Sequence, residues 1–126
     1  MIFKKLMPAK PEYPFKSQLE KNIYNEILTK FPNIKILVNK KGLIKNHKNF
    51  ELDLYFPQYK LGLEIQGPTH VADINTILKD YKKQDLFSKE GIRIMYIYIN
   101  LKNKSYSIRK CIEILNNEMG RYTQQH

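Results

Sequence analysis

The chain of 126 residues carries 22 Lys and Arg against 12 Asp and Glu, which gives a formal net charge of +10 at pH 7. Hydrophobic residues make up 42% and charged residues 27% of the chain, so the composition excludes bulk disorder and suits one packed domain. The positive charge indicates a polyanionic partner, nucleic acid before an anionic membrane surface. Most of the excess is Lys, in a chain rich in Asn and Ile, so AT-rich codon usage is an alternative explanation.

The cysteine count and the apolar segments bear on the compartment. The single cysteine, Cys111, excludes an internal disulfide and a cysteine metal cage, and we expect it to be a small core residue. Residues 1–7 are too short and too basic a segment for a signal peptide. The most apolar stretch, Ile92–Ile99, is too short to span a bilayer. We therefore expect a soluble protein of a reducing compartment, the cytoplasm, with no membrane partner.

The N-terminal part of the chain predicts a basic arm followed by a helix. Residues 1–15 are basic and interrupted by prolines, so we expect an extended arm there. Ser17 and Glu20 have capping-box spacing, and apolar residues then recur at helical spacing until Pro32. From this helix onward we predict a single domain over residues 16–122.

The next segment predicts three strands. Ile34–Asn39 has the composition of a short strand, and Lys40–Asn49 that of a polar, basic loop. Phe50–Phe56 and Leu61–Gln66 alternate apolar and polar residues, as half-buried strands do, and a short hairpin connection joins them. In the first strand of this hairpin the alternation predicts that one face carries all the apolar side chains, namely Phe50, Leu52, Leu54 and Phe56.

The C-terminal part predicts a helix, a strand and a last helix. Ile74–Glu90 is helical in pattern, with Gly91 as its C-terminal cap. Ile92–Ile99 is apolar on both faces, as expected for an interior strand. Ser105–Met119 predicts the last helix, and residues 120–126 a frayed tail. The order predicts an α+β fold with an αβββαβ core, a mixed sheet flanked by helices, and an added C-terminal helix.

Two carboxylates stand out on the predicted hairpin. Asp53 and Glu64 lie on the polar faces of its two strands, and antiparallel neighbours bring such side chains together across the ladder. Carboxylates on rigid strands suit Mg²⁺ (or Mn²⁺), which keeps waters for a substrate phosphate and activates one of them. The alternative is a pair of solvated acids on an exposed sheet face.

The order of several short motifs resembles the PD-(D/E)xK nuclease superfamily, which has the restriction-endonuclease-like fold. FELDLYF at residues 50–56 and LGLEIQG at 61–67 are similar to its strand with an Asp followed by a strand with acid-x-Lys. DxxKxxxFxxxG at residues 80–91 resembles a helix of the small branch related to very-short-patch-repair endonucleases. GPTH at residues 67–70 resembles the RAP domain of RNA-processing proteins. The resemblance covers roughly residues 17–99.

The resemblance implies roles for individual residues. Asp53 and Glu64 would bind the metal, and Glu20 matches the auxiliary acid of the family, a role compatible with helix capping. Gln66 stands where the family has a Lys that orients or activates the attacking water, and Gln carries no such charge. Lys83, one helix away, is a candidate for the missing cation; the alternative is a solvated Lys on a helix face.

The remaining candidates surround this centre. His70 follows the Glu64 strand and is a candidate general base or phosphate contact; the alternative is a loop histidine bonded to backbone. Basic side chains are expected to bind nucleic-acid phosphates, namely Lys40, Lys41, Lys45, Lys48 and Lys83.

We therefore expect a Mg²⁺-dependent endonuclease that hydrolyses phosphodiester bonds, with DNA before RNA as its substrate. The presence of Glu20, Asp53 and Glu64 together favours this enzyme. The alternative is a non-catalytic or RNA-directed binding module of the RAP type, which Gln66 favours. A chain of this length has little room for a separate domain that reads the target sequence, so a homodimer and a sequence-reading partner subunit are two further alternatives.

Overall fold

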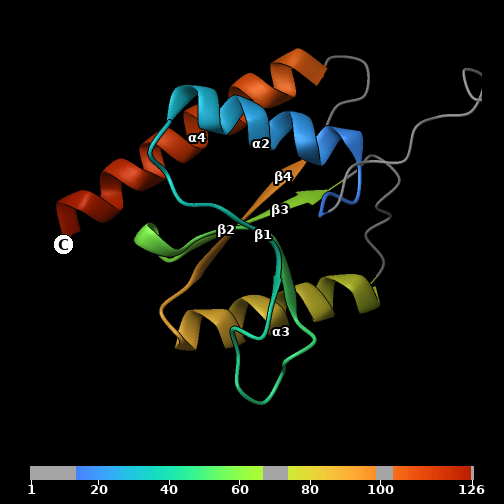
Figure 1. The fold of residues 1–126 in the computed structure, drawn as a ribbon. Coiled ribbons are helices and arrows are strands. Elements are labelled where there is room, and N and C mark those ends of the chain that lie inside the picture. Colours follow the sequence, from blue (N-terminus) through green and yellow to red (C-terminus); the bar gives the residue numbers. More distant parts are fainter. Residues whose placement is uncertain (1–13, 67–73, 99–103, 126) are drawn as a thin grey trace, which may run out of the picture.

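The computed structural model describes residues 14–66, 74–98 and 104–125, with the side chains of 104–107 and 121–125 left out (Figure 1). The helices and strands confirm the predicted αβββαβ order with a closing helix. In chain order they are α2 (Gln18–Lys30), β1 (Leu37–Lys41), β2 (Glu51–Phe56), the short 3₁₀ helix η1 (Pro57–Tyr59), β3 (Leu61–Gln66), α3 (Ile74–Lys89), β4 (Arg93–Tyr98) and α4 (Lys104–Gln125).

The sheet is mixed and lies between two helical layers. Its strand order is β1-β2-β3-β4, with antiparallel pairing in the first two ladders and parallel pairing of β3 with β4. The short connection through η1 fixes the antiparallel hairpin, whereas the crossover through α3 makes β4 parallel. In Figure 1, α2 and α4 cover one face of the sheet and α3 covers the other.

Strand β4 lies at the edge of the described sheet, so the prediction of an interior strand is wrong. The pattern misled because β4 is apolar on both faces. Both α3 and α4 contact this strand, so each face is covered although one long edge has no neighbouring strand among the described residues. A strand that is apolar on both faces is therefore one that helices cover on both faces, whether or not it is central in the sheet.

Two of the predicted helix ends are confirmed at the level of their hydrogen bonds. Ser17 is the N-cap of α2, and its Oγ accepts a hydrogen bond from the Glu20 N–H at 3.1 Å. Gly91 has a φ of 77°, the left-handed conformation that ends many helices. The N–H of Ile92 then donates to the Phe87 carbonyl at 2.9 Å and closes the last turn of α3.

Two other boundaries differ from the predictions. Strand β1 begins at Leu37 and ends at Lys41, because its register with β2 (Leu37 opposite Tyr55) decides where pairing starts. Helix α4 continues to Gln125, so the predicted frayed tail is wrong and the predicted domain end falls within the helix. A single Gly120 costs only about 1 kcal/mol against Ala, and propagation adds one hydrogen bond per residue.

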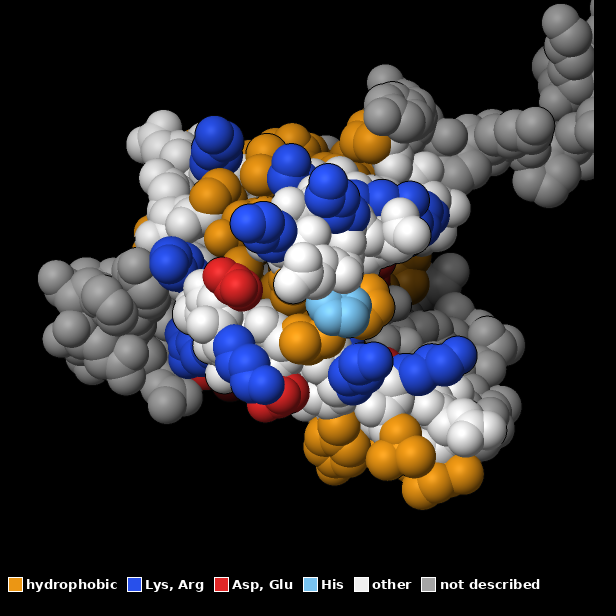
Figure 2. Space-filling model, turned by 90° about the horizontal axis from the view of Figure 1, so that it is seen from below, with side chains coloured by type: hydrophobic (Ala, Val, Ile, Leu, Met, Phe, Trp, Pro, Cys, Tyr) orange, Lys and Arg blue, Asp and Glu red, His pale blue; other side chains and the backbone are white. Residues whose placement is uncertain are grey.

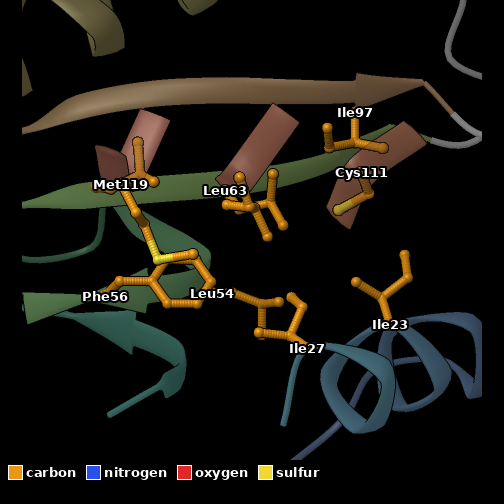
Figure 3. Close-up of a cluster of buried hydrophobic side chains, with 10 residues drawn as sticks. Ile23, Ile27, Leu54, Phe56, Leu63, Ile97, Cys111 and Met119 are labelled. Carbon is orange, nitrogen blue, oxygen red and sulfur yellow. The ribbon is translucent and has the colours of Figure 1, made fainter. Parts of the chain in front are cut away.

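The core consists of two clusters on opposite faces of the sheet. The smaller cluster packs under α3 and is formed by Ile44, Leu52, Tyr55, Phe87 and Ile92. The larger cluster lies between the sheet and α2 and α4 (Figure 3). Its members come from five helices and strands and include Cys111, as expected: Ile23, Ile27, Leu54, Phe56, Leu61, Leu63, Ile97, Cys111, Leu115 and Met119.

Strand β2 changes face part-way along its length. Leu54 packs in the larger cluster, whereas Leu52 belongs to the smaller cluster and Phe50 packs against it. The prediction that these residues share one face is therefore wrong. On β3, Gly62 gives Leu52 its space, since a Cβ at that position would lie 2.7 Å from the Leu52 Cδ1. The change of face falls at Asp53.

Candidate active site

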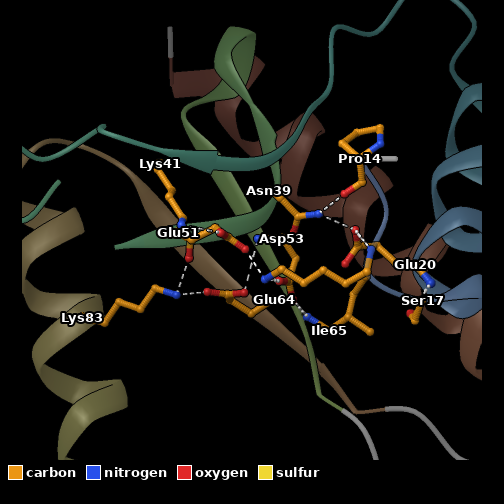
Figure 4. A network of polar contacts seen from close by, with 11 residues as sticks. Pro14, Ser17, Glu20, Asn39, Lys41, Glu51, Asp53, Glu64, Ile65 and Lys83 are labelled. Atoms are coloured by element: carbon orange, nitrogen blue, oxygen red, sulfur yellow. Dashed lines mark hydrogen bonds and ion pairs between the residues drawn. The ribbon is translucent and has the colours of Figure 1, made fainter. Parts of the chain in front are cut away.

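The ladder between β2 and β3 opens at Asp53. Regular pairing runs from the hairpin to the pair Leu54 and Leu63. Beyond it, side chains bond to the facing backbone (Figure 4): the Glu64 Oε2 accepts from the Asp53 N–H at 3.3 Å, and the Asp53 Oδ2 accepts from the Ile65 N–H at 2.8 Å. Because both carboxylates satisfy backbone donors of the opposite strand, the two strands part here and the carboxylates fill the opening. We call this opening, with Asp53, Glu64 and Ile65, the fork.

Strand β1 is also irregular beside the fork. Asn39 has a φ of 51°, a left-handed conformation, while the residues on either side of it pair with β2. The Asn39 Nδ2 donates to the Pro14 carbonyl at 2.6 Å and to the Glu20 Oε1 at 2.9 Å. Its Oδ1 is buried and has no hydrogen-bond partner in the part of the chain that the structure describes. Asn39 therefore ties the beginning of α2 to the sheet next to the fork.

Two lysines bring positive charge to these carboxylates. The Lys83 Nζ donates to the Glu64 Oε1 and, at 2.5 Å, to the Glu51 carbonyl. The Lys16 Nζ forms an ion pair with the Glu51 carboxylate and lies 3.8 Å from the Asp53 Oδ1. With a side chain only 21% exposed, Lys83 is held in the site and is not the solvated helix-face residue of the alternative.

Burial dominates the electrostatics of the fork. Desolvation, and next the charge of Asp53, raise the pKa of Glu64 to about 7, although Lys83 acts in the opposite direction. Desolvation is also the main reason that the pKa of Glu20 is raised. A pKa of about 7 means that the Glu64 carboxyl is partly protonated at neutral pH, and positive charge added at the fork would favour its ionised form.

The donor set at the fork suits a divalent cation. The buried carboxylate of Glu64 and the partly buried carboxylate of Asp53 converge there, and Mg²⁺ is commonly held by one or two carboxylates together with waters. The partnerless Asn39 Oδ1 is a further buried oxygen nearby. Over the described ranges, no three His, Cys, Asp or Glu side chains form a metal-binding group. Asp53 and Glu64 are therefore the pair that would hold a cation, with waters completing its coordination.

No family model and no curated protein matches the chain. Among solved structures, the catalytic domain of the homing endonuclease I-Bth0305I is similar with a TM-score of 0.60 and 17% identity, over 84% of this chain and 98% of that one. The 5-hydroxymethylcytosine-specific restriction enzyme AbaSI is similar with a TM-score of 0.55 and 17% identity, over 98% of this chain. The fold is restriction-endonuclease-like.

This result confirms the fold predicted from the motifs. The chain spans 47% of the AbaSI chain, about half its length. The narrower resemblance to very-short-patch-repair endonucleases and RAP domains stays a prediction. In the described part of the chain, no helix is long and apolar enough to cross a membrane.

The remaining residues predicted for the active centre differ in how close they lie to the fork. Gln66 is half-buried at the end of β3, opposite Tyr98 of β4. Glu20 is 4% exposed and reaches the fork region through Asn39. His70 lies outside the described residues.

The basic side chains lie around the fork end of β1 and β2. Lys40 and Lys41 belong to β1 itself, and with Lys45 and Lys48 they are exposed. The predicted polar loop begins only after Lys41, and it carries a core residue, because Ile44 is 5% exposed within the smaller core cluster. Figure 2 shows many Lys and Arg side chains and few acidic ones on the face seen from the α3 side.

Sequence reasoning missed three residues of the network: Lys16, Asn39 and Glu51. Glu51 had a detectable signal, since alternation on β2 predicts the same face as Asp53. Asn39 had a weak one, because Asn is among the non-glycine residues that most often adopt positive φ. Lys16 had none, because only the folded chain brings its amine to Glu51.

Proposed function

We propose that the chain is a metal-dependent nuclease that hydrolyses phosphodiester bonds of DNA. The observation that carries the proposal is the fork, where the buried carboxylate of Glu64 and the partly buried carboxylate of Asp53 meet at the opening of two paired strands. The raised pKa of Glu64 supports it, because burial and the charge of Asp53 disfavour the ionised carboxylate and a bound cation would favour it. The similar structures, a homing endonuclease domain and a restriction enzyme, support DNA as the substrate.

Each residue of the fork has a part in this proposal. Asp53 and Glu64 would hold Mg²⁺ or Mn²⁺, which when bound supplies charge neutralisation at the phosphate and activation of a water. The Lys83 amine, which contacts Glu64, would supply the positive charge that Gln66 cannot carry. Glu20, held by Asn39, would orient groups beside Asp53.

Delivery of the substrate falls to the exposed basic residues. A strand whose phosphate reached the fork would pass the exposed lysines at the end of β1 and in the segment that follows. Phosphate contacts of this kind bind sequence-independently and weaken with salt. The net charge of +10 agrees with such a role.

A second candidate function is a non-catalytic or RNA-directed binding module of the RAP type. The observation that favours it is the position of the two amines, because Lys16 and Lys83 already compensate the carboxylates without any metal. In that case the carboxylates hold the fork together, and the chain needs no catalytic lysine at the position of Gln66.

Thermal melting and cleavage together test the proposal. We compare wild type with Asp53→Asn and with the control Asp85→Asn, the same chemical change at an α3 residue 66% exposed. Wild type and the control should gain melting temperature with Mn²⁺, by mass action, and should cut plasmid DNA. Asp53→Asn should lose both properties and still bind DNA in chelator. If wild type shows no metal-dependent shift and cuts neither plasmid nor structured RNA, the nuclease proposal is wrong.

A further inference from the structure

A pocket of about 290 Å³ lies between α3 and β4, outside the fork. Its lining combines aromatic rings with hydrogen-bonding groups, and comes from one face of the helix and from the end of the strand. The lining residues are Ile77, Asp80, Tyr81, Gln84, Tyr96 and Tyr98.

The pocket adjoins the fork through the parallel ladder. Tyr96 is paired with Glu64, and Tyr98 with Gln66. Paired residues on neighbouring strands lie about 5 Å apart and share a face of the sheet, so the pocket begins one strand away from Glu64. On α3, the residue before Gln84 is the lysine that contacts Glu64. The strand residues that line the pocket, Tyr96 and Tyr98, come from the carboxyl end of β4.

The chemistry of the lining fits a flat heteroaromatic ring with polar edges. Tyr81 and Tyr98 are 65% and 71% exposed, so their rings are available for stacking. Gln84 both donates and accepts hydrogen bonds, and the Asp80 carboxylate accepts them. The Tyr96 hydroxyl is buried and has no hydrogen-bond partner among the described residues, an arrangement that a ligand's polar edge would relieve.

We propose that this pocket binds one unstacked nucleobase of the nucleic acid whose phosphate lies at the fork. The inference rests on the proposed nuclease function and adds a base-binding subsite to it. The volume is at the small end for ligand pockets, which suits one base and excludes a larger stacked segment.

Binding to fluorescent oligonucleotides in chelator tests the stacking part of the proposal without any cleavage. The variants are Tyr81→Ala and Tyr98→Ala, with Tyr98→Phe to keep the ring. The matched control is Leu78→Ala, an α3 residue 58% exposed that does not line the pocket. All three positions are exposed, so melting temperatures should stay near wild type. The two alanine variants should bind about tenfold more weakly, and Tyr98→Phe and Leu78→Ala like wild type.

An oligonucleotide scan then locates the base. Single-stranded probes lacking one base at successive positions should lose affinity for wild type at one position only. Tyr98→Ala should show a smaller loss at that position, because one of the two stacking contacts is already absent. Mismatched and fully paired duplexes distinguish the source of the base: a base flipped from a duplex binds better when mismatched, since less unpairing is required.

The outcomes separate this inference from the function beneath it. If Tyr81→Ala and Tyr98→Ala bind as tightly as Leu78→Ala, or if no single position of the scan depends on Tyr98, the base subsite is wrong and the nuclease proposal stands. If wild type binds neither single strands nor duplexes in any salt, both proposals are wrong.

Discussion

The two ends of the β2–β3 hairpin are built from the same strands and differ in almost every other respect. At the hairpin end, Leu54, Phe56, Leu61 and Leu63 are fully buried and the main-chain ladder is closed. At the fork end, the ladder is open and carboxylates take the backbone donors. The first end gains its stability from apolar burial. The second end buries a carboxylate, and the raised pKa of Glu64 shows that this burial disfavours its charged form.

The comparison shows how a small domain keeps acids inside its sheet. Each fork carboxylate accepts a backbone hydrogen bond and lies near a lysine amine. Buried charges persist where such partners compensate their desolvation, and replacing both partners is often neutral. Substitutions at the closed end should therefore unfold the protein, whereas substitutions at the fork should change its electrostatics and its chemistry.

The largest expected effect is at the closed end. Phe56→Ala removes a side chain that is 0% exposed in the larger core cluster. Loss of burial and the cavity left behind should lower the free energy of unfolding by about 3–5 kcal/mol, measured by chemical denaturation. Asp53→Asn should change it far less. Equal losses for the two variants would show that the fork supports the fold as strongly as the core does.

Much of this fold is visible in the sequence, because local patterns determine it. Leu61–Gln66 is predicted with its observed bounds, and Ser17 and Gly91 as helix ends. The change of face within β2 is not visible. Apolar residues occupy every second position on both sides of Asp53. Because helices cover both faces of the sheet, this alternation does not reveal which of the two core clusters each apolar residue joins.

The sequence predicts only the part of the site that depends on which strands are neighbours. Asp53 and Glu64 follow from the hairpin, because its short connection fixes which residues face each other. The contact of Lys83 with Glu64 depends on how α3 crosses the sheet, and helical periodicity does not contain that angle. The same reason hides Lys16, whose partner is 35 positions along the chain.

The second prediction concerns the charge around the fork end. Replacing the four exposed lysines there with Ala should weaken nucleic-acid binding for all sequences alike, by roughly a hundredfold at low salt. Each lost phosphate contact should reduce the slope of log affinity against log salt by about 0.9. A binding titration over salt concentration measures the slope. The lysines replaced are Lys40, Lys41, Lys45 and Lys48.

The matched control is Lys30→Ala with Lys110→Ala, two exposed lysines of α2 and α4 on the other side of the sheet. The slope should stay as in wild type in this variant. The control removes two charges and the fork-end variant four. A control that lost about half as much slope as the fork-end variant would therefore mean that binding follows net charge alone, and that the fork end has no special share in it.

The third prediction is a pH dependence of metal-free stability. In the folded chain Glu64 keeps its proton to about pH 7, whereas a free Glu releases it near 4.5. Between these values the folded state binds more protons than the unfolded state, so stability should fall as pH rises through this window. Glu64→Gln should remove this decline, and above pH 7 its free energy of unfolding should exceed that of wild type by on the order of 1–3 kcal/mol.

Chemical denaturation in chelator at several pH values measures this effect. Glu113→Gln, a change at a side chain 64% exposed, is the control and should follow wild type. Added Mn²⁺ should stabilise wild type more strongly above pH 7, because the cation needs the ionised carboxylate. A wild type whose stability rises steadily from pH 4.5 to 7 would contradict burial as the dominant influence on Glu64.

The smallest expected effect is the difference between two substitutions at Asn39. Asn39→Ala and Asn39→Gly both remove the hydrogen bonds to Pro14 and Glu20, but only Gly adopts the left-handed backbone without strain. Asn39→Gly should therefore be about 1 kcal/mol more stable than Asn39→Ala. If Asn39 positions Glu20 for the reaction, both variants should lose cleavage to the same degree although their stabilities differ. Cleavage that instead follows stability would assign Asn39 to the fold alone, and the fork would then act without help from α2.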